Sequence, residues 1–173
     1  MNKKTIVSLL VLALVAVACA AETTEEAVEE VVVEKTTLET VTDRGFLKCG
    51  VSGSAVAFSE TQADGSVTGI DADYCYAVAA AVFGDVEAIE YEIVDGVSRF
   101  IYLIDGTIDI LSAATTYTFT RNVLKKFEFL PTTYYDGQGF ITKRTLGVSS
   151  AKQMHGAKIC FSGSGTAAKN IKD

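Results

Sequence analysis

The feature that most constrains the fold is a regular alternation of short apolar runs with longer segments of helical periodicity. Apolar residues dominate Phe46 to Val51, alternate with polar residues from Ala88 to Val94, and make up three of the four residues from Ile108 to Leu111. Runs of this length are typical of strands in a sheet. A segment with helical spacing lies between each pair of runs. The order strand, helix, strand, helix, strand predicts a parallel sheet and an α/β fold.

The two intervening helices are indicated by apolar spacing and by glycine stops. The first follows the short run from Val67 to Ile70, and we expect it from about Asp71 to Phe83, with Gly84 ending it. The second is expected from about Val97 to Ile104, because Asp105-Gly106 is a turn signal. The residues expected on one apolar face of the first helix are Tyr74, Cys75, Val78, Ala81 and Val82.

The turn that leaves the third strand, Ser112 to Arg121, reads S-A-A-T-T-Y-T-F-T-R. Ligands of open α/β sheets bind beyond the carboxyl ends of the strands. Arg121 offers a planar fork that fits a carboxylate, and Thr115, Thr116 and Thr118 offer hydroxyls, which together suit an amino acid. The alternative is an ordinary loop, because Ser and Thr often bond their own backbone and a loop arginine is usually solvated.

Residues 1–20 have the features of an export signal. Lys3 and Lys4 precede an apolar core from Ile6 to Ala18, interrupted only by Ser8, which is too short to span a bilayer comfortably. Ala16 and Ala18 fit ordinary cleavage, whereas Cys19 fits a lipoprotein signal in which the cysteine is lipidated. Both fates remain open.

Residues 21–37 form an acidic segment that we expect to be a disordered tether. Six glutamates lie between Glu22 and Glu34, a stretch without glycine or aromatic residues, and such a sequence repels itself and buries little. The chain has a net charge of −7, and without those glutamates, Lys3, Lys4 and Lys35 it retains 16 acids and 12 bases. This charge lacks the basic footprint of a nucleic-acid-binding protein.

Five further motifs share their order and spacing with one protein family. They are L-K-C-G-V at Leu47 to Val51, G-I-D-A-D-Y-C-Y-A-V at Gly69 to Val78, R-F at Arg99-Phe100 with D-G-T-I-D-I-L-S at Asp105 to Ser112, the segment Thr115 to Arg121, and Y-Y-D-G-Q-G-F at Tyr134 to Phe140. With them the chain resembles the bacterial solute-binding proteins of family 3, in particular the general L-amino-acid-binding proteins of ABC importers. The resemblance runs from about Leu38 to the last residue.

The resemblance implies a two-lobed fold of the periplasmic-binding-protein type 2 class. We expect residues 38–138 to form a nearly complete first lobe, and residues 139–173 to form the crossover and the truncated start of a second lobe. On this expectation the chain is an N-terminal fragment of a longer protein.

The resemblance also implies a ligand site. Residues matching Ala114, Thr115 and Thr116 hold the ligand's α-amino and α-carboxylate groups, Arg121 clamps the carboxylate, and Phe58 lies on the cleft wall. Gly165 and Thr166 touch the carboxylate from the second lobe, although a flexible glycine-serine loop is an equal alternative there. The chain departs from the family pattern at Ala114, which offers only its backbone, and at Ala55 and Ser52.

The function implied is that of an exported, periplasmic binding component of an ABC importer, which captures an L-amino acid between two lobes and delivers it to permease subunits. No cofactor, metal or catalytic group is expected. Membrane attachment through a lipidated Cys19 and the identity of the amino acid stay open. The alternatives are a cyclohexadienyl or arogenate dehydratase-like enzyme on the same fold and the sensing module of a receptor.

The remaining segments carry weaker patterns. With the resemblance, Tyr134 to Phe140 is expected to be a hinge strand, whereas Asp136-Gly137 alone would indicate a β-turn. Beyond it we expect a short helix in Val148 to His155, a strand in Ala157 to Phe161, and a small-residue turn from Ser162 to Thr166 into another helix. That turn has no P-loop lysine.

Three cysteines lie beyond the export signal: Cys49, Cys75 and Cys160. Cys49 and Cys75 could pair in an oxidising compartment. A strand cysteine and a cysteine on an apolar helix face are also commonly buried as free thiols, and we expect the free form.

Overall fold

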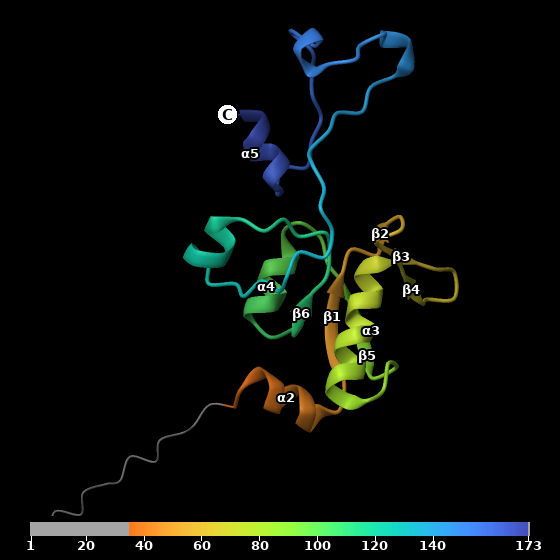
Figure 1. Cartoon of the computed structure of the whole chain (residues 1–173), viewed down its shortest axis with the longest axis vertical. Coiled ribbons are helices and arrows are strands. Elements are labelled where there is room, and N and C mark those ends of the chain that lie inside the picture. Colours follow the sequence, from red (N-terminus) through yellow and green to blue (C-terminus); the bar gives the residue numbers. More distant parts are fainter. Residues whose placement is uncertain (1–34, 173) are drawn as a thin grey trace, which may run out of the picture. The chain divides into compact units, whose positions relative to one another are not determined.

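The computed structural model describes residues 35–172. The predicted export signal, Cys19 and most of the predicted tether therefore lie outside the described residues. The described part begins with helix α2 (Thr37–Arg44) (Figure 1). Thr36 caps this helix, because its hydroxyl accepts the Glu39 N–H while the Glu39 carboxylate accepts the Thr36 N–H.

A three-stranded parallel sheet follows, as the alternating pattern predicted. It consists of β1 (Leu47–Val51), β5 (Ile89–Ile93) and β6 (Ile110–Leu111), in the order β5-β1-β6. Leu47 to Val51 pair in register with Ile89 to Ile93, and Cys49 pairs with Ile110. The central strand β1 is therefore hydrogen-bonded on both sides, and its burial follows from that position.

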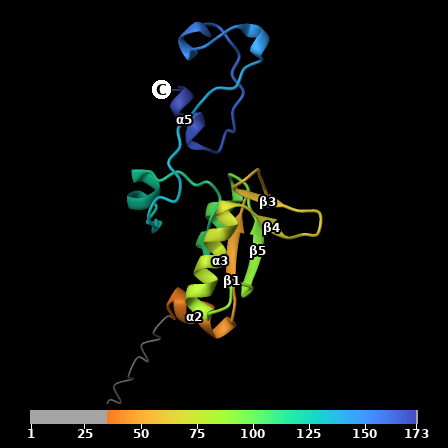
Figure 2. The ribbon, with the colours of Figure 1, turned by 45° about the vertical axis from the view of Figure 1, so that its right-hand side comes forward.

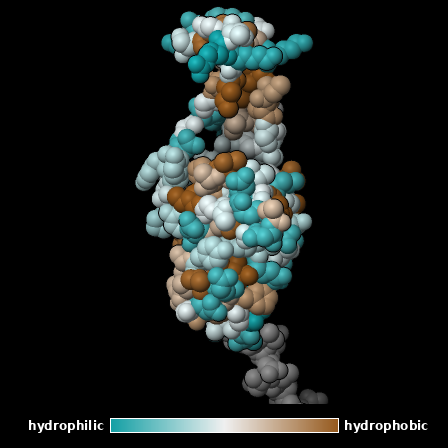
Figure 3. Space-filling view, turned by 90° about the vertical axis from the view of Figure 1, so that its right-hand side faces the viewer, coloured by the Kyte–Doolittle hydropathy of each residue, from teal (hydrophilic) through white to brown (hydrophobic). Residues whose placement is uncertain are grey.

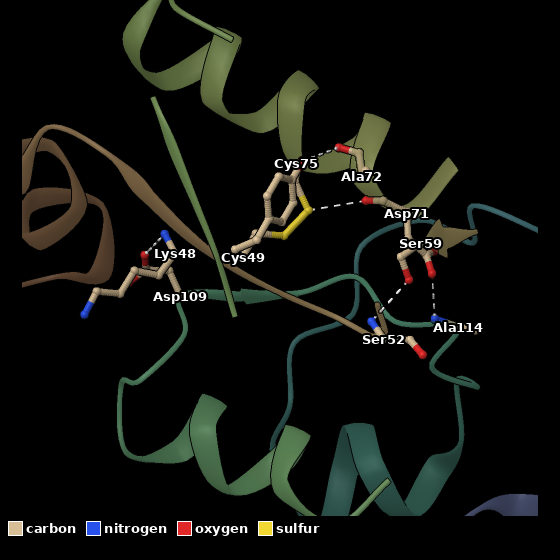
Figure 4. Close-up of a disulfide and its surroundings, with 10 residues drawn as sticks. Lys48, Cys49, Ser52, Ser59, Asp71, Ala72, Cys75, Asp109 and Ala114 are labelled. Atoms are coloured by element: carbon tan, nitrogen blue, oxygen red, sulfur yellow. Dashed lines mark hydrogen bonds between the residues drawn. A yellow bond between two sulfur atoms is a disulfide. The ribbon is translucent and has the colours of Figure 1, made fainter. Parts of the chain in front are cut away.

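Helices α3 (Ile70–Phe83) and α4 (Ser98–Ile104) cover the two faces of this sheet (Figure 4). On one face Cys49 and Val51 pack with Ala72 and Cys75 of α3. Gly50 faces the other way, because a side chain there would meet Ile108 and Val94. That second apolar cluster consists of Val94, Ile108 and Ala113, with Tyr102, Leu103 and Leu111 packed against it.

The apolar face predicted for α3 is partly wrong. Tyr74 and Ala81 are exposed, while the buried residues are Asp71, Ala72, Cys75 and Ala79. The small residues Ala72, Cys75 and Ala79 face β1, so the buried stripe lies to one side of the predicted face. The helix does end at Gly84, which has a left-handed φ of 71°.

A small antiparallel sheet precedes α3 and was not predicted as a sheet. Strands β2 (Ser54–Ala55), β3 (Ser59–Thr61) and β4 (Val67–Thr68) pair in sequence order. Figure 2 shows β3 and β4 close to β5. Val67 contributes to the core cluster under α3. The polar loop at Asp64 and Gly65 is the turn between β3 and β4.

Cys49 and Cys75 form a disulfide, which corrects the expectation of free thiols (Figure 4). Both residues are fully buried, and their Cα atoms lie 6.2 Å apart. The sequence showed that each faces an apolar environment, but not that β1 and α3 bring them onto the same side of the sheet. Cys160 is a free, exposed cysteine.

Little core forms after Ala113. Among residues 114–172, the buried hydrophobic side chains are Phe127 and Ala168. The regular elements there are short: η1 (Thr120–Leu124), η2 (Arg144–Leu146), η3 (Ala151–Gln153) and α5 (Thr166–Lys172). Hydrophobic residues also reach the surface in separate groups, as the face in Figure 3 shows.

Two predictions for this C-terminal stretch are wrong and two hold in part. Ala157 to Phe161 forms no strand, and Tyr134 to Phe140 forms neither a strand nor the alternative β-turn. Neither segment has a neighbouring strand to bond, and Ile159 and Phe161 stay exposed. The helix expected in Val148 to His155 is reduced to the single turn η3, whereas the Ser162 to Thr166 turn does lead into α5.

No helix in residues 35–172 combines the length and apolar character needed to cross a membrane.

Candidate ligand-binding site

The segment Ser112 to Arg121 leaves the carboxyl end of β6, as predicted. The Ser112 N–H donates to Gly50 O at 2.9 Å and extends the pairing with β1 by one bond. Beyond it the chain is irregular until η1, which contains Arg121. The hydroxyls and the arginine are therefore held at the edge of the sheet where ligands of α/β proteins bind.

Ala114 is held by a buried aspartate that the sequence did not single out. The Asp71 carboxylate, only 5% exposed, accepts the Ala114 N–H at 3.2 Å, and Ala114 has a left-handed φ of 44° (Figure 4). Burial raises the pKa of Asp71, and hydrogen bonds from Ala114 and Ser59 partly offset that rise. Asp71 therefore fixes the backbone of the predicted site.

Asp71 is itself positioned by the residue that opens α3. Gly69 has a φ of 122°, and a Cβ there would lie 2.5 Å from Phe58 O. Only glycine fits such a crowded left-handed position. The Asp71 N–H donates to the same Phe58 O at 2.8 Å, which ties α3 to the loop before β3.

Arg121 is buried, although a loop arginine is usually solvated. Its side chain is 8% exposed, and Nη1 donates to Thr116 O at 2.6 Å. The guanidinium lies 4.9 Å from the centroid of the Phe100 ring, which stacks on Phe127 with centroids 5.1 Å apart. The ion pairs among residues 35–172 are Lys35–Asp43 and Arg44–Asp109, so no carboxylate of the described chain neutralises Arg121.

A second arginine, Arg99 of α4, belongs to the same cluster. Its guanidinium also lies 4.9 Å from the Phe100 centroid, and Nη1 is 3.5 Å from Thr115 Oγ1. Burial lowers the pKa of Arg121, and the Arg99 cation lowers it further. Guanidinium groups stay protonated at neutral pH even so, and the cluster is a cationic site.

Residues from the far end of the described chain approach this cluster at two points. Thr116 Oγ1 and Thr166 Oγ1 lie 3.4 Å apart. The Ser164 side chain lies against Gly96, where a Cβ would come within 3 Å of it. Gly165 sits between these contacts in the turn before α5, so the structure brings Gly165 and Thr166 to the side of the site that holds Thr116.

Phe58 contacts a different partner. It packs edge to face against Tyr134, with ring centroids 5.2 Å apart. Through its backbone it also accepts from Asp71, whose carboxylate holds Ala114. Phe58 is therefore connected to the site through Asp71.

An open hollow lies at the carboxyl ends of β1 and β5. Its volume is about 550 Å³. Ser52 and Ser54 line one side, and Asp95, Ser98 and Tyr102 line another; Ile93, Val94 and Gly96 complete it. Asp95 Oδ1 accepts hydrogen bonds from the N–H groups of Val97 and Ser98, and it thereby stabilises the start of α4.

The arrangement is suited to binding an anion. The buried Arg121 guanidinium, the half-buried Arg99 guanidinium, two threonine hydroxyls and irregular backbone converge, and a carboxylate is the group that such a set binds best. Within residues 35–172, no group of three or more His, Cys, Asp or Glu side chains is arranged to hold a metal ion.

Sequence reasoning missed Asp71, Phe100 and the burial of Arg99. An aspartate in the first turn of a helix usually faces solvent and stabilises the helix start. Arg99 and Phe100 were noted only as part of a motif. Their shared contact with the Ser112 to Arg121 segment depends on how α4 packs, which no local pattern reports.

Comparison with known proteins agrees with this geometry. The family described as bacterial extracellular solute-binding proteins, family 3, matches residues 47–157. The chain therefore belongs to this family, and the described residues have part of a type 2 periplasmic-binding-protein fold.

Individual relatives are similar over most of this chain. The general L-amino acid-binding periplasmic protein AapJ of Rhizobium johnstonii is 43% identical over 138 residues, which cover 80% of this chain and 40% of the relative. The glutamate/glutamine/aspartate/asparagine-binding protein BztA of Rhodobacter capsulatus is 41% identical over 137 residues, 79% of this chain and 40% of the relative.

A solved structure is also similar. The ABC transporter periplasmic binding protein from Brucella ovis, with glutathione bound, matches with a TM-score of 0.77 and 38% identity, covering 81% of this chain and 44% of that one. The chain thus spans about 40% of the length of the curated relatives it matches.

Proposed function

We propose that this protein is the binding component of an amino-acid ABC importer, which captures an L-amino acid between two lobes and delivers it to permease subunits. The observation that carries the proposal is Arg121, a buried guanidinium without a carboxylate partner in the described chain, held beside Thr115 and Thr116. A buried charge is costly unless it is paired, so a carboxylate ligand would complete the site.

The relatives support the same class of ligand. The Rhizobium and Rhodobacter proteins are named as amino-acid-binding proteins, and the Brucella structure holds glutathione, a peptide with free carboxylates. These relatives are binding proteins, which favours binding over catalysis for this chain.

In the proposed complex Arg121 clamps the α-carboxylate. Thr115, Thr116 and the backbone of Ala114 hold the α-carboxylate and α-ammonium groups, with Asp71 fixing Ala114 from behind. Phe58 borders the ligand from the first lobe. Gly165 and Thr166 approach the carboxylate from the other side, where Thr166 already lies near Thr116. Ligand contacts shared by both sides would favour a closed state.

An exported location fits the disulfide. Disulfides persist in oxidising compartments such as the periplasm, and Cys49 and Cys75 are bonded and fully buried. We propose a periplasmic protein with permease subunits as partners. Attachment to the membrane through a lipidated Cys19 is a further possibility of this proposal, to be tested by mass spectrometry of the mature N-terminus.

The test is ligand binding with the disulfide formed. Saturation-transfer NMR on the full chain, with a panel of L-amino acids and glutathione, detects weak ligands. A second protein carries residues 47–157 in place of the matching segment of the Rhizobium relative. We expect at least one L-amino acid to bind both proteins, and Arg121→Ala to abolish the binding.

Arg144→Ala is the matched control, because Arg144 is an exposed arginine of η2 outside the site. It should bind as the parent does. Absence of binding by both parent proteins to every amino acid, or undiminished binding by Arg121→Ala, would contradict the proposed function.

A further inference from the structure

We propose that Arg99 recognises a second carboxylate, so that the site prefers acidic amino acids over their neutral amides. This inference rests on the proposed function, since it assigns a ligand class to the same site. It concerns a residue of α4, outside the Ser112 to Arg121 segment.

Arg99 has hydrogen-bonding capacity that the described chain does not use. Its Nε is fully buried without a hydrogen-bond partner. Its Nη1 contact with Thr115 Oγ1, at 3.5 Å, is long for a hydrogen bond. Buried donors are nearly always satisfied in folded proteins, and a charged one is the costliest to leave unpaired. A group from outside the described chain would satisfy Arg99.

Nearby acids do not satisfy Arg99 either. Asp95 is the acid that favours its charged form, but Asp95 Oδ1 already accepts the N–H groups of Val97 and Ser98 and lies beyond ion-pair distance. Asp71 is occupied by the Ala114 N–H. Two cations therefore meet at one place without an anion from residues 35–172.

Charge balance then decides the ligand class. A ligand with one carboxylate would neutralise Arg121 and leave the half-buried Arg99, with its buried Nε, uncompensated. The guanidiniums each lie 4.9 Å from the centroid of the same Phe100 ring, so they are separated by no more than twice that distance. The two carboxylates of glutamate or aspartate are joined by a short aliphatic chain, and their spacing falls within this upper limit. An acidic amino acid would supply one carboxylate to each arginine.

The alternative role for Arg99 is a brace, in which it supports the site by stacking on Phe100 and touching Thr115. A brace would affect all ligands alike. A second-carboxylate site would affect acidic ligands alone. The comparison of glutamate with glutamine separates the two roles, because these ligands differ only in the side-chain group.

The experiment measures dissociation constants of L-glutamate, L-glutamine, L-aspartate and L-asparagine for the full chain and for Arg99→Met, Arg99→Lys and the exposed control Arg144→Met. Arg99→Met keeps an apolar stem of similar length against Phe100. We expect this variant to bind glutamate and aspartate about tenfold more weakly or worse, because a charged hydrogen bond is lost. Its affinity for glutamine and asparagine should change far less. Arg99→Lys should partly restore the affinity for the acidic ligands. Arg144→Met should bind all four ligands as the parent does.

If Arg99→Met reduced the affinity for the acids and for the amides equally, Arg99 would have a purely structural role. That result would overturn the inference and leave the proposed function intact. Unchanged binding of all four ligands would overturn it as well. If the parent protein bound none of the four nor any other amino acid, the proposed function itself would fail.

Discussion

Arg121 keeps only 8% of its surface exposed, yet its side chain bonds a backbone carbonyl rather than a carboxylate. Its neighbours are the Phe100 ring, the Thr116 carbonyl and the Arg99 cation. Such a residue is maintained at a cost to stability, which is a common feature of binding sites. Arg121 can contribute to binding through its charge and through its planar, two-pronged shape, and substitutions can separate these two contributions.

Lysine at position 121 would keep the charge and lose the planar fork. We expect Arg121→Lys to retain binding of the preferred amino acid but to weaken it about tenfold, because one of two parallel hydrogen bonds to the carboxylate is lost. Calorimetric titration or NMR titration of parent and variant measures the difference. Affinity equal to the parent's would mean that bidentate binding is not used.

Asp71 offers a prediction on pH. Burial raises the folded-state pKa of this carboxyl above its ordinary value of 3.8, so the folded state holds the proton more tightly than the unfolded state. Stability from this group is present below the unfolded pKa and is lost as pH rises through the folded pKa. Relative to Asp71→Asn, the parent should therefore lose free energy of unfolding between acidic and neutral pH.

Urea unfolding of both proteins at several pH values measures that difference. Asn keeps an oxygen that can accept the Ala114 N–H, so the variant should fold. Glu39→Gln on the exposed α2 is a useful contrast, because hydrogen bonds to Thr36 lower the pKa of Glu39 and the sign of its pH dependence is opposite. If the free energy of unfolding of the parent instead rose with pH relative to that of Asp71→Asn, the raised pKa of Asp71 would be contradicted.

At the scale of elements, two links hold the sheet to its neighbours. The disulfide joins β1 to α3 across one face. The Arg44–Asp109 ion pair joins the end of α2 to the residue before β6, and Asp109 also accepts the Lys48 N–H of β1 at 2.7 Å. Each link spans segments that are distant in sequence, so each constrains the topology.

Removal of the disulfide should destabilise the fold substantially. The cysteines are 26 residues apart, and closing a loop of that size corresponds to about 3.5 kcal/mol in the chain-entropy description. We expect Cys49→Ala/Cys75→Ala to lose roughly that free energy of unfolding in urea. Cys160→Ser, which removes the exposed free thiol, should lose little. Equal stability of the double variant and the parent would exclude a stabilising bridge.

Loss of the Arg44–Asp109 pair should also destabilise, because it would leave a largely buried carboxylate with fewer partners. For Arg44→Met we expect a loss of about 2–3 kcal/mol, as for other charged hydrogen bonds in partly buried sites. Lys35→Met removes the exposed Lys35–Asp43 pair and should leave the urea midpoint unchanged. Similar midpoints for the two variants would mean that burial does not strengthen the Arg44 pair.

The elements that could be predicted from sequence are those with a local signal and a neighbour to pair with. β1, β5 and α3 have both, and their order was enough for the parallel sheet. The capping sequence at Thr36 and Glu39 also marks α2, although that helix was not predicted. Ala157 to Phe161 had the local signal alone and forms no strand.

The site could be predicted only in part for a related reason. The hydroxyls and Arg121 are contiguous in sequence, so a local reading finds them. Asp71 and Arg99 reach the segment from two different helices, and their roles depend on how those helices pack. The disulfide was considered but the free thiols were favoured, because facing directions across a sheet are a property of the assembled fold.

At the scale of the molecule, the described core is concentrated in residues 41–113, and the candidate site lies where this core ends. The later chain returns to the site through Thr166 and Ser164 rather than through a core of its own. An approach from two parts of the chain fits the proposed capture of a small ligand, and the family membership of residues 47–157 agrees with that proposal.

In the proposed complex, the site holds the α-carboxylate of an amino acid. The most direct measurement compares the tightest-binding L-amino acid of the panel with its own α-amide, which keeps the side chain and the ammonium group but lacks the α-carboxylate. We predict that the α-amide binds at least about a hundredfold more weakly, because Arg121 would stay buried without its partner. Equal affinity for the amino acid and its α-amide would contradict the account.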